Sequence, residues 1–147
     1  MINPSRLKAI LIDAICIMLG LLFVYAAFNK LLDFKNFHLE LAQSPMLSAF
    51  AEWISWTIPL TEIVIALLLF VPKFRVHALF ASFTLMTMFT AYIYILLNYS
   101  AFVPCSCGGI LDSLTWMQHM IFNIAFASLA AIAFMLQPIY QNIKIRS

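Results

Sequence analysis

Long runs of apolar residues, separated by short stretches rich in charge, proline or glycine, dominate the chain. A helix needs about 20 mostly apolar residues to cross a bilayer. Four segments meet this condition, and they cover about residues 9–32, 54–71, 76–99 and 114–136. The breaks fit the pattern, because Pro72 closes the second segment and Pro104 separates the third from the fourth. The sequence therefore predicts a single-domain, all-α membrane protein built as a four-helix transmembrane bundle.

The connection between the first two spans, about residues 33–53, has a different pattern. It mixes large apolar side chains such as Phe37 and Trp53 with polar ones, and Pro45 interrupts it. Such mixing is typical of short helices that lie in the membrane interface. We expect interfacial helices here, and an unstructured loop is the alternative.

Composition narrows the class of protein. Of the 147 residues, 65% are hydrophobic and 10% are charged, whereas about 25% are charged in a soluble domain. Most of the surface must therefore face the lipid bilayer. The net charge of +2 is small and scattered, which gives no basis for binding nucleic acid. The basic start is not followed by a small-residue cleavage site, so we expect the first span to be retained and not removed as a signal peptide.

The distribution of lysine and arginine predicts how the bundle is oriented, because cytoplasmic loops carry an excess of these residues. In an up-down-up-down bundle, the chain termini and the connection between spans two and three share one side. That side carries Arg6, Lys8, Lys73, Arg75, Lys144 and Arg146, and the other side carries Lys30 and Lys35. We therefore expect both termini in the cytoplasm and the loop over residues 100–113 outside.

That outer loop carries two cysteines separated by one residue, Cys105 and Cys107. A disulfide in so small a ring is strained, and strain makes it easier to reduce, which suits thiol–disulfide exchange. The predicted side is also the oxidising one. A structural clip and a metal site are the alternatives, and the metal site is disfavoured because only His119 is an obvious third ligand. Cys16 lies apart in span one and is expected to be an apolar filler.

Polar residues inside the predicted spans point to the same end of the bundle. Trp116, His119 and Asn123 have spacings that place them on one helical face. Glu62 should lie at a similar depth in the second span. Ionisable groups at such depth are costly and tend to be functional, so we expect proton handling by Glu62 and His119. Polar contacts that join helices are the alternative, and that alternative is favoured for Asn123.

The outer end of the first span adds two candidates to this cluster, Asn29 and Tyr25, and Lys30 ends the span on the same side. Aromatic residues near the outer surface, among them Tyr92, are expected to form an interfacial belt. A slot for a flat ring is the alternative role for these aromatic residues.

Three segments resemble known membrane families. Residues 20–31 (GLLFVYAAFNKL) resemble the first span of DoxX-like proteins, and residues 58–62 (IPLTE) resemble the start of their second span. Residues 105–109 (CSCGG), followed by Trp116, His119 and Asn123, resemble the MauE branch, which is associated with methylamine utilisation and redox chemistry. The resemblance covers nearly the whole chain and rests on the order of short motifs.

The resemblance implies a multi-pass protein of the bacterial inner membrane that takes part in thiol redox chemistry. MauE-type proteins are linked to the maturation of disulfide-rich periplasmic enzymes, and DoxX-type proteins to quinone-coupled sulfur oxidation. The architecture is also similar to quinone-linked disulfide-forming proteins and to the vitamin K epoxide reductase family. Those systems typically use two cysteine pairs, and this chain has one C-x-C pair. A separate thioredoxin-like or cysteine-containing partner is therefore expected, and a quinone is the cofactor that the resemblance suggests.

The leading hypothesis is a membrane thiol–disulfide redox component, which makes the protein a candidate oxidoreductase. The catalytic candidates are Cys105, Cys107, His119 and Glu62, and the cofactor-binding candidates are Trp116, Asn123, Asn29 and Tyr25. A second hypothesis is a non-enzymatic subunit of a larger complex, in which the C-x-C pair is a structural disulfide. A third is a small transporter or lipid-binding protein that uses Glu62 and His119.

Overall fold

The fold is an all-helical bundle, as the hydrophobic pattern predicts. The computed structural model describes residues 3–101 and 114–146, with side chains as far as Gln137. Its helices are α1 (Pro4–Leu32), α2 (Phe34–Gln43), α3 (Ala51–Phe70), α4 (Arg75–Tyr99) and α5 (Trp116–Arg146), with short 3-10 turns η1 (Ser48–Phe50) and η2 (Pro72–Phe74). No strand occurs in these residues. Four segments are long and apolar enough to cross a membrane: Pro4–Leu32, Ser48–Phe70, Pro72–Tyr99 and Trp116–Gln137. They correspond to the four predicted spans.

The helix boundaries lie within five residues of the predicted spans, except that α5 continues to Arg146, ten residues past its predicted end. The first helix begins at Pro4, where a proline is tolerated because the first amides of a helix have no partner within it. Asn3 caps this end, and its side chain accepts a hydrogen bond from the Ser5 amide at 3.4 Å. The segment between the first two spans folds into α2 and η1, in agreement with the expected short helices. Its position in the membrane interface stays a prediction.

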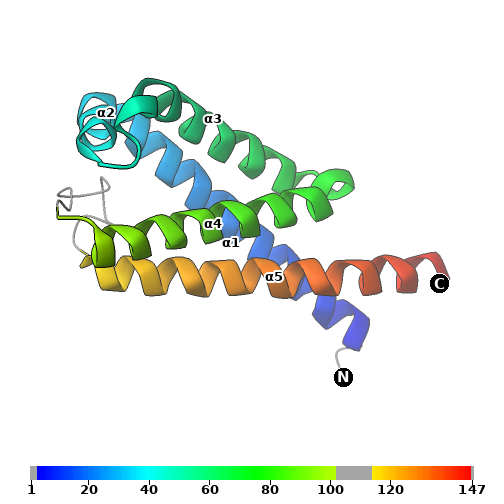
Figure 1. The fold of residues 1–147 in the computed structure, drawn as a ribbon. Coiled ribbons are helices and arrows are strands. Elements are labelled where there is room, and N and C mark those ends of the chain that lie inside the picture. The colour runs from blue at the N-terminus through cyan, green and yellow to red at the C-terminus, as the bar shows by residue number, and fades with distance from the viewer. Residues whose placement is uncertain (1–2, 102–113, 147) are drawn as a thin grey trace.

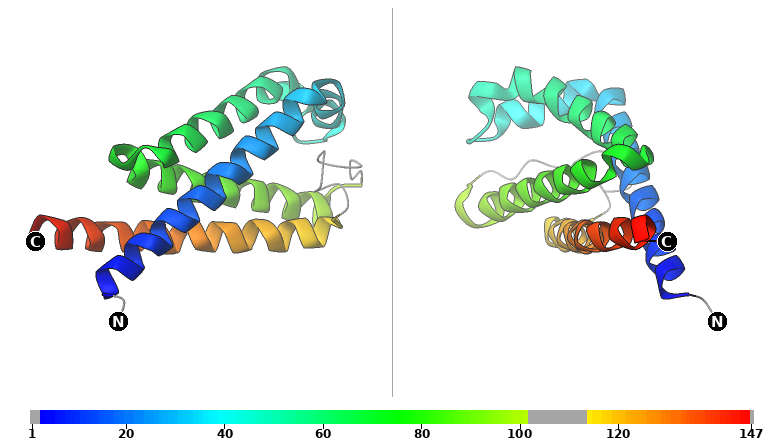
Figure 2. Two further views of the ribbon diagram at one scale, coloured as in Figure 1. Left: turned by 180° about the vertical axis from the view of Figure 1, so that it is seen from behind. Right: turned by 90° about the vertical axis from the view of Figure 1, so that its right-hand side faces the viewer.

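Two pairs of helices make up the bundle (Figure 1). The α1 helix packs along α3, α4 packs along α5, and α1 also contacts α5. The α3 and α4 helices diverge from their short connection at η2, and α2 lies at the end where they are far apart (Figures 1 and 2). The chain ends of α1 and α5 lie at the opposite end from α2. Which end faces the cytoplasm stays a prediction.

The close-packed core occupies one half of the bundle, the half nearer η2 and the chain ends. It is built from the first two-thirds of α1, the second half of α3, the start of α4 and the later part of α5. Small residues there bring the helices close together, as is common in membrane bundles. A side-chain carbon added to Gly20 in α1 would come within 2.6 Å of the Phe70 ring of α3. Cys16 is buried in this core without a disulfide, as predicted.

An ion pair joins α1 to the start of α4 near η2. Arg75 Nη1 donates a hydrogen bond to Asp13 Oδ1 over 2.6 Å, and the Asp13 side chain is 55% exposed. The remaining surface of the spans is largely apolar, with exposed residues such as Leu21, Leu60 and Ile121. Such a surface is stable when it faces lipid chains.

Candidate functional site

The other half of the bundle, away from the core, encloses a pocket of about 340 Å³. It lies where α3 and α4 have diverged, and α1, α2 and α5 complete its wall. A volume of this size is within the range of pockets that hold small ligands. Most of the lining is apolar or aromatic, and it includes Phe23, Phe37, Phe89 and Trp116. The polar lining residues are Asn29, Lys30, Thr57, Glu62, Tyr92, His119 and Asn123.

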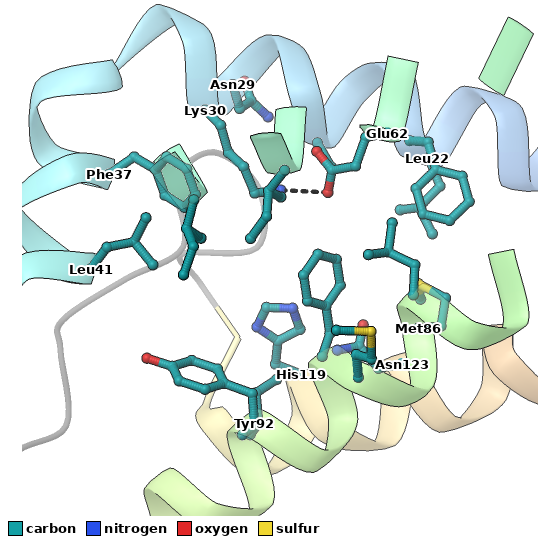
Figure 3. Close-up of a pocket in the computed structure, with 18 of the residues that line it drawn as sticks. Leu22, Asn29, Lys30, Phe37, Leu41, Glu62, Met86, Tyr92, His119 and Asn123 are labelled. Atoms are coloured by element: carbon teal, nitrogen blue, oxygen red, sulfur yellow. Dashed lines mark hydrogen bonds and ion pairs between the residues drawn. The ribbon is translucent and has the colours of Figure 1, made fainter. Parts of the chain in front are cut away.

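A buried ion pair between α1 and α3 forms one wall of the pocket (Figure 3). Lys30 Nζ lies 2.8 Å from Glu62 Oε1, and the two side chains are 15% and 1% exposed. Lys30 Nζ also lies 5.9 Å from the centre of the Phe37 ring and 5.7 Å from that of Phe89, within the range of cation–π attraction. The pair therefore places two opposite charges beside aromatic rings inside a membrane span.

The opposite wall comes from the first turns of α5. His119 and Asn123 project into the pocket across from Lys30 and Glu62 (Figure 3). Trp116 lies beside them, with its ring centre 6.4 Å from that of His119 and a 21° angle between the two ring planes. The three residues that the helical spacing places on one face thus all line the same cavity.

The start of α5 is fixed by a reciprocal cap. The Gln118 amide donates to Thr115 Oγ1 at 3.3 Å, and the Thr115 amide donates to Gln118 Oε1 at 3.0 Å. Such a capping box satisfies two amides that would otherwise lack partners. It sets the register that turns Trp116 and His119 into the pocket.

Two further predicted residues lie on the α1 wall with different outcomes. Asn29 lines the pocket beside Lys30, whereas Tyr25 is half-buried and lies outside the set of described lining residues. Tyr92 differs from the expected belt residue. Its half-buried ring lines the pocket, and its hydroxyl donates to Ser44 Oγ at 3.0 Å.

Lys30 and the segment around α2 were missed as site residues by the sequence analysis. Lys30 could have been identified from its position, because it follows Asn29 at the end of the first span. The second span carries an acidic residue, Glu62, at a similar depth. For α2, the apolar residues Phe37 and Leu41 carried the signal, since they are one turn apart on one helical face. Both residues line the pocket.

The predicted catalytic cysteines, Cys105 and Cys107, lie outside the described residues. The chain leaves the described part after Ala101, just beyond the end of α4, and returns at Leu114, just before α5. The loop that carries the cysteines is therefore attached to the end of the bundle that holds the pocket.

Comparison with known proteins identifies the family to which this architecture belongs. A family model described as methylamine utilisation protein MauE matches residues 8–136, which is most of the chain. The chain belongs to the MauE family. This finding confirms the resemblance to MauE proteins seen in the sequence, and with the four apolar helices it makes the chain a multi-pass membrane protein. No curated protein and no solved structure matches the chain. The MauE match covers all the residues that line the pocket and the loop with the cysteine pair.

Proposed function

We propose that this MauE-family protein is a thiol–disulfide redox component of the bacterial inner membrane. Cys105 and Cys107 exchange electrons with an extracytoplasmic thioredoxin-like or cysteine-containing protein. This exchange serves methylamine utilisation, the process named in the family description. The observation that carries the proposal is the position of the ionisable pocket at the end of the bundle to which the cysteine loop is attached.

The exchange passes two electrons from the partner's thiols to the Cys105–Cys107 disulfide in two steps. A thiolate of the partner attacks the Cys105–Cys107 disulfide, which forms a mixed disulfide and releases one C-x-C thiolate. The second partner thiolate then attacks the mixed disulfide, so that the partner leaves oxidised and the C-x-C pair is left as a dithiol. Reoxidation of the dithiol releases two electrons and two protons. A quinone would supply the acceptor for both and would leave as a quinol, so the overall reaction would neither gain nor lose protons.

The pocket supports this assignment through its chemistry. The imidazole of His119 can both accept and donate a proton, which suits a residue that handles protons. It lies at the end of the first turn of α5, the helix that follows the cysteine loop. Glu62 and Lys30 add a carboxylate and an ammonium group within the same cavity. Ionisable groups at membrane depth mark proton and substrate pathways in many membrane proteins.

Trapping of mixed disulfides tests the proposal. A Cys105→Ser or Cys107→Ser variant should retain a covalently attached partner that is released by reductant and identified by mass spectrometry. Cys16→Ser is the matched control, since Cys16 is buried in the core, and it should trap nothing. A stoichiometric partner that co-purifies without any disulfide would favour the non-enzymatic subunit instead.

The reduction potential of the cysteine pair gives a second, independent test. Structural disulfides typically have potentials below about −300 mV. Titration in glutathione and dithiothreitol buffers, read by thiol alkylation, should place this pair well above that value. A potential below about −300 mV would identify the pair as a structural clip and refute the exchange reaction.

A further inference from the structure

Three buried polar atoms in the pocket have no hydrogen-bond partner within the described part of the chain. They are Asn29 Nδ2, Asn123 Nδ2 and Glu62 Oε2. The Asn123 and Glu62 residues are 4% and 1% exposed, so bulk water does not satisfy them. Buried polar groups nearly always have partners, and a cluster of unpaired ones in a cavity therefore needs an explanation. Within a membrane the need is greater, because lipid chains offer no hydrogen bonds.

We propose that these groups bind the ring of a membrane-dissolved quinone, which enters the pocket sideways from the bilayer between α3 and α4. The proposal rests on the proposed function only for the redox role of the ligand, because binding itself follows from the pocket. It names the residues that hold the acceptor and the route by which the acceptor arrives.

The unpaired atoms match the two redox forms of such a ring. In the oxidised form, two carbonyl oxygens on opposite sides of the ring accept hydrogen bonds from the amides of Asn29 and Asn123, which lie on the α1 and α5 walls. In the reduced form these oxygens carry protons. The carboxylate oxygen Glu62 Oε2 then accepts from a hydroxyl, and each asparagine amide can present its oxygen in place of its nitrogen. Both forms are thus satisfied by the same side chains.

The charge of the pocket favours a neutral ring over an anionic lipid headgroup. The Lys30 ammonium is already paired with Glu62 at 2.8 Å, so a phosphate would gain no unpaired positive charge there. It would also meet the Glu62 carboxylate, and like charges in a low-dielectric site repel strongly. Phe23, Phe89 and Trp116 add apolar and aromatic surface to the lining, against which a flat ring can stack.

The mouth of the pocket opens toward lipid. Thr57 of α3 and Met88 of α4 line the cavity and are both exposed, Met88 by 61%. They belong to two membrane-spanning helices that diverge in this half of the bundle (Figure 1). A cavity of about 340 Å³ holds a ring and its substituents, and a long isoprenoid tail has to remain in the bilayer. The opening between α3 and α4 gives that tail its exit.

Tryptophan fluorescence measures binding at this site directly. The chain has three tryptophans, and a Trp53→Phe/Trp56→Phe background leaves Trp116 in the pocket as the sole reporter. Titration with a decyl-substituted benzoquinone in detergent micelles should quench Trp116 saturably, and an anionic phospholipid should not compete. Absence of saturable quenching, or displacement of the quinone by phospholipid, would overturn the proposal.

Matched variants test which groups hold the ring. Asn123→Leu should weaken quinone binding at least tenfold. Gln137→Leu is the control, because Gln137 is also buried with an unpaired oxygen but lies outside the pocket lining; it should leave the affinity unchanged. Equal affinities in the two variants would refute the assignment of Asn123.

A larger side chain at the pocket opening tests the lateral route and leaves the buried polar groups unchanged. Met88→Trp should lower quinone affinity at least tenfold by narrowing the opening, as measured by titration calorimetry. Met18→Trp adds the same bulk to another exposed methionine, on the α1 surface away from the pocket, and should not change the affinity. Both variants keep the core intact, so a retained affinity in Met88→Trp would rule out the lateral route.

A last variant separates this inference from the proposed function. Cys105→Ser/Cys107→Ser should bind the quinone with unchanged affinity while losing thiol exchange. If quenching is present but the wild-type cysteines do not cycle, the pocket assignment stands and the redox function is wrong. If the cysteines cycle in a protein that shows no quenching, the pocket assignment alone is wrong.

Discussion

The buried ion pair between Lys30 and Glu62 makes a quantitative prediction about stability. The perturbation is a double-mutant cycle formed by Lys30→Met, Glu62→Gln and the combination of the two. The Nζ–Oε1 distance is 2.8 Å, and the Glu62 side chain is 1% exposed. Removal of one partner leaves the other charge without compensation, which costs roughly 3–5 kcal/mol in buried pairs.

The two single variants should not cost the same. The Lys30 side chain is 15% exposed and sits near the end of α1 at Leu32, so without Glu62 its long stem can carry the ammonium toward the interface. We therefore expect about 1–2 kcal/mol for Glu62→Gln. The shorter Glu62 side chain has no such escape. It stays buried as an unpaired charge, so Lys30→Met should cost about 3–4 kcal/mol.

The double variant should be less destabilised than the sum of the singles. It contains no buried charge, only an amide whose burial costs about 1–3 kcal/mol. The coupling energy should be about 2–3 kcal/mol, at the upper end for residues in contact. Reversible unfolding in mixed micelles with increasing dodecyl sulfate measures all four free energies.

A more exposed ion pair, between Asp13 and Arg75, provides the control for this cycle. Asp13 and Arg75 are closer, at 2.6 Å, but the Asp13 side chain is 55% exposed, and exposed pairs contribute about 0–1 kcal/mol. Their own cycle, with Asp13→Asn and Arg75→Gln, should show a coupling below about 1 kcal/mol. Additive effects at Lys30 and Glu62, or equal coupling in the two pairs, would refute the reasoning from burial.

Two other predictions concern membrane orientation and the start of α5. A membrane-impermeant maleimide applied from outside after mild reduction should label Cys105 and Cys107 and should not label Cys16; labelling from the cytoplasmic side alone would reverse the predicted orientation. Thr115→Ala should destabilise the protein by about 1 kcal/mol, because it removes the cap on the Gln118 amide. The same unfolding assay measures it, and a loss within error would show that the cap does not stabilise α5.

The four spans could be predicted from the sequence because the bilayer imposes a length and a composition that few other structures share. The predicted ranges fall within five residues of the observed helices, apart from the end of α5, which continues to Arg146. The cap of α5 was missed. The helix begins at Trp116 with Thr115 as its cap. The cap of a helix is hard to place from sequence to within a residue or two, because several neighbouring polar residues can each act as the N-cap.

Part of the candidate site followed from helical periodicity, and part did not. Spacing within α5 was enough to place Trp116, His119 and Asn123 on one face. The partner of Glu62 was not predictable in this way, because the contact with Lys30 depends on how α1 and α3 pack, which no local pattern encodes. Tyr92 was missed for a related reason: a tyrosine near the end of a span faces either lipid or a neighbouring helix, and only the packing decides between them.

The division of the bundle into a packed half and a hollow half has a consequence for selectivity. Phe23 and Met86 belong both to the core and to the lining of the pocket, so the floor of the pocket is made of core side chains. Close-packed interiors tolerate little change in shape. The opposite end, beside Thr57 and Met88, faces fluid lipid. A molecule bound here is therefore discriminated by the size and substitution of its ring, whereas its chain can be of any length. A benzoquinone and a naphthoquinone should bind differently, and homologues that differ only in the number of isoprene units should bind alike.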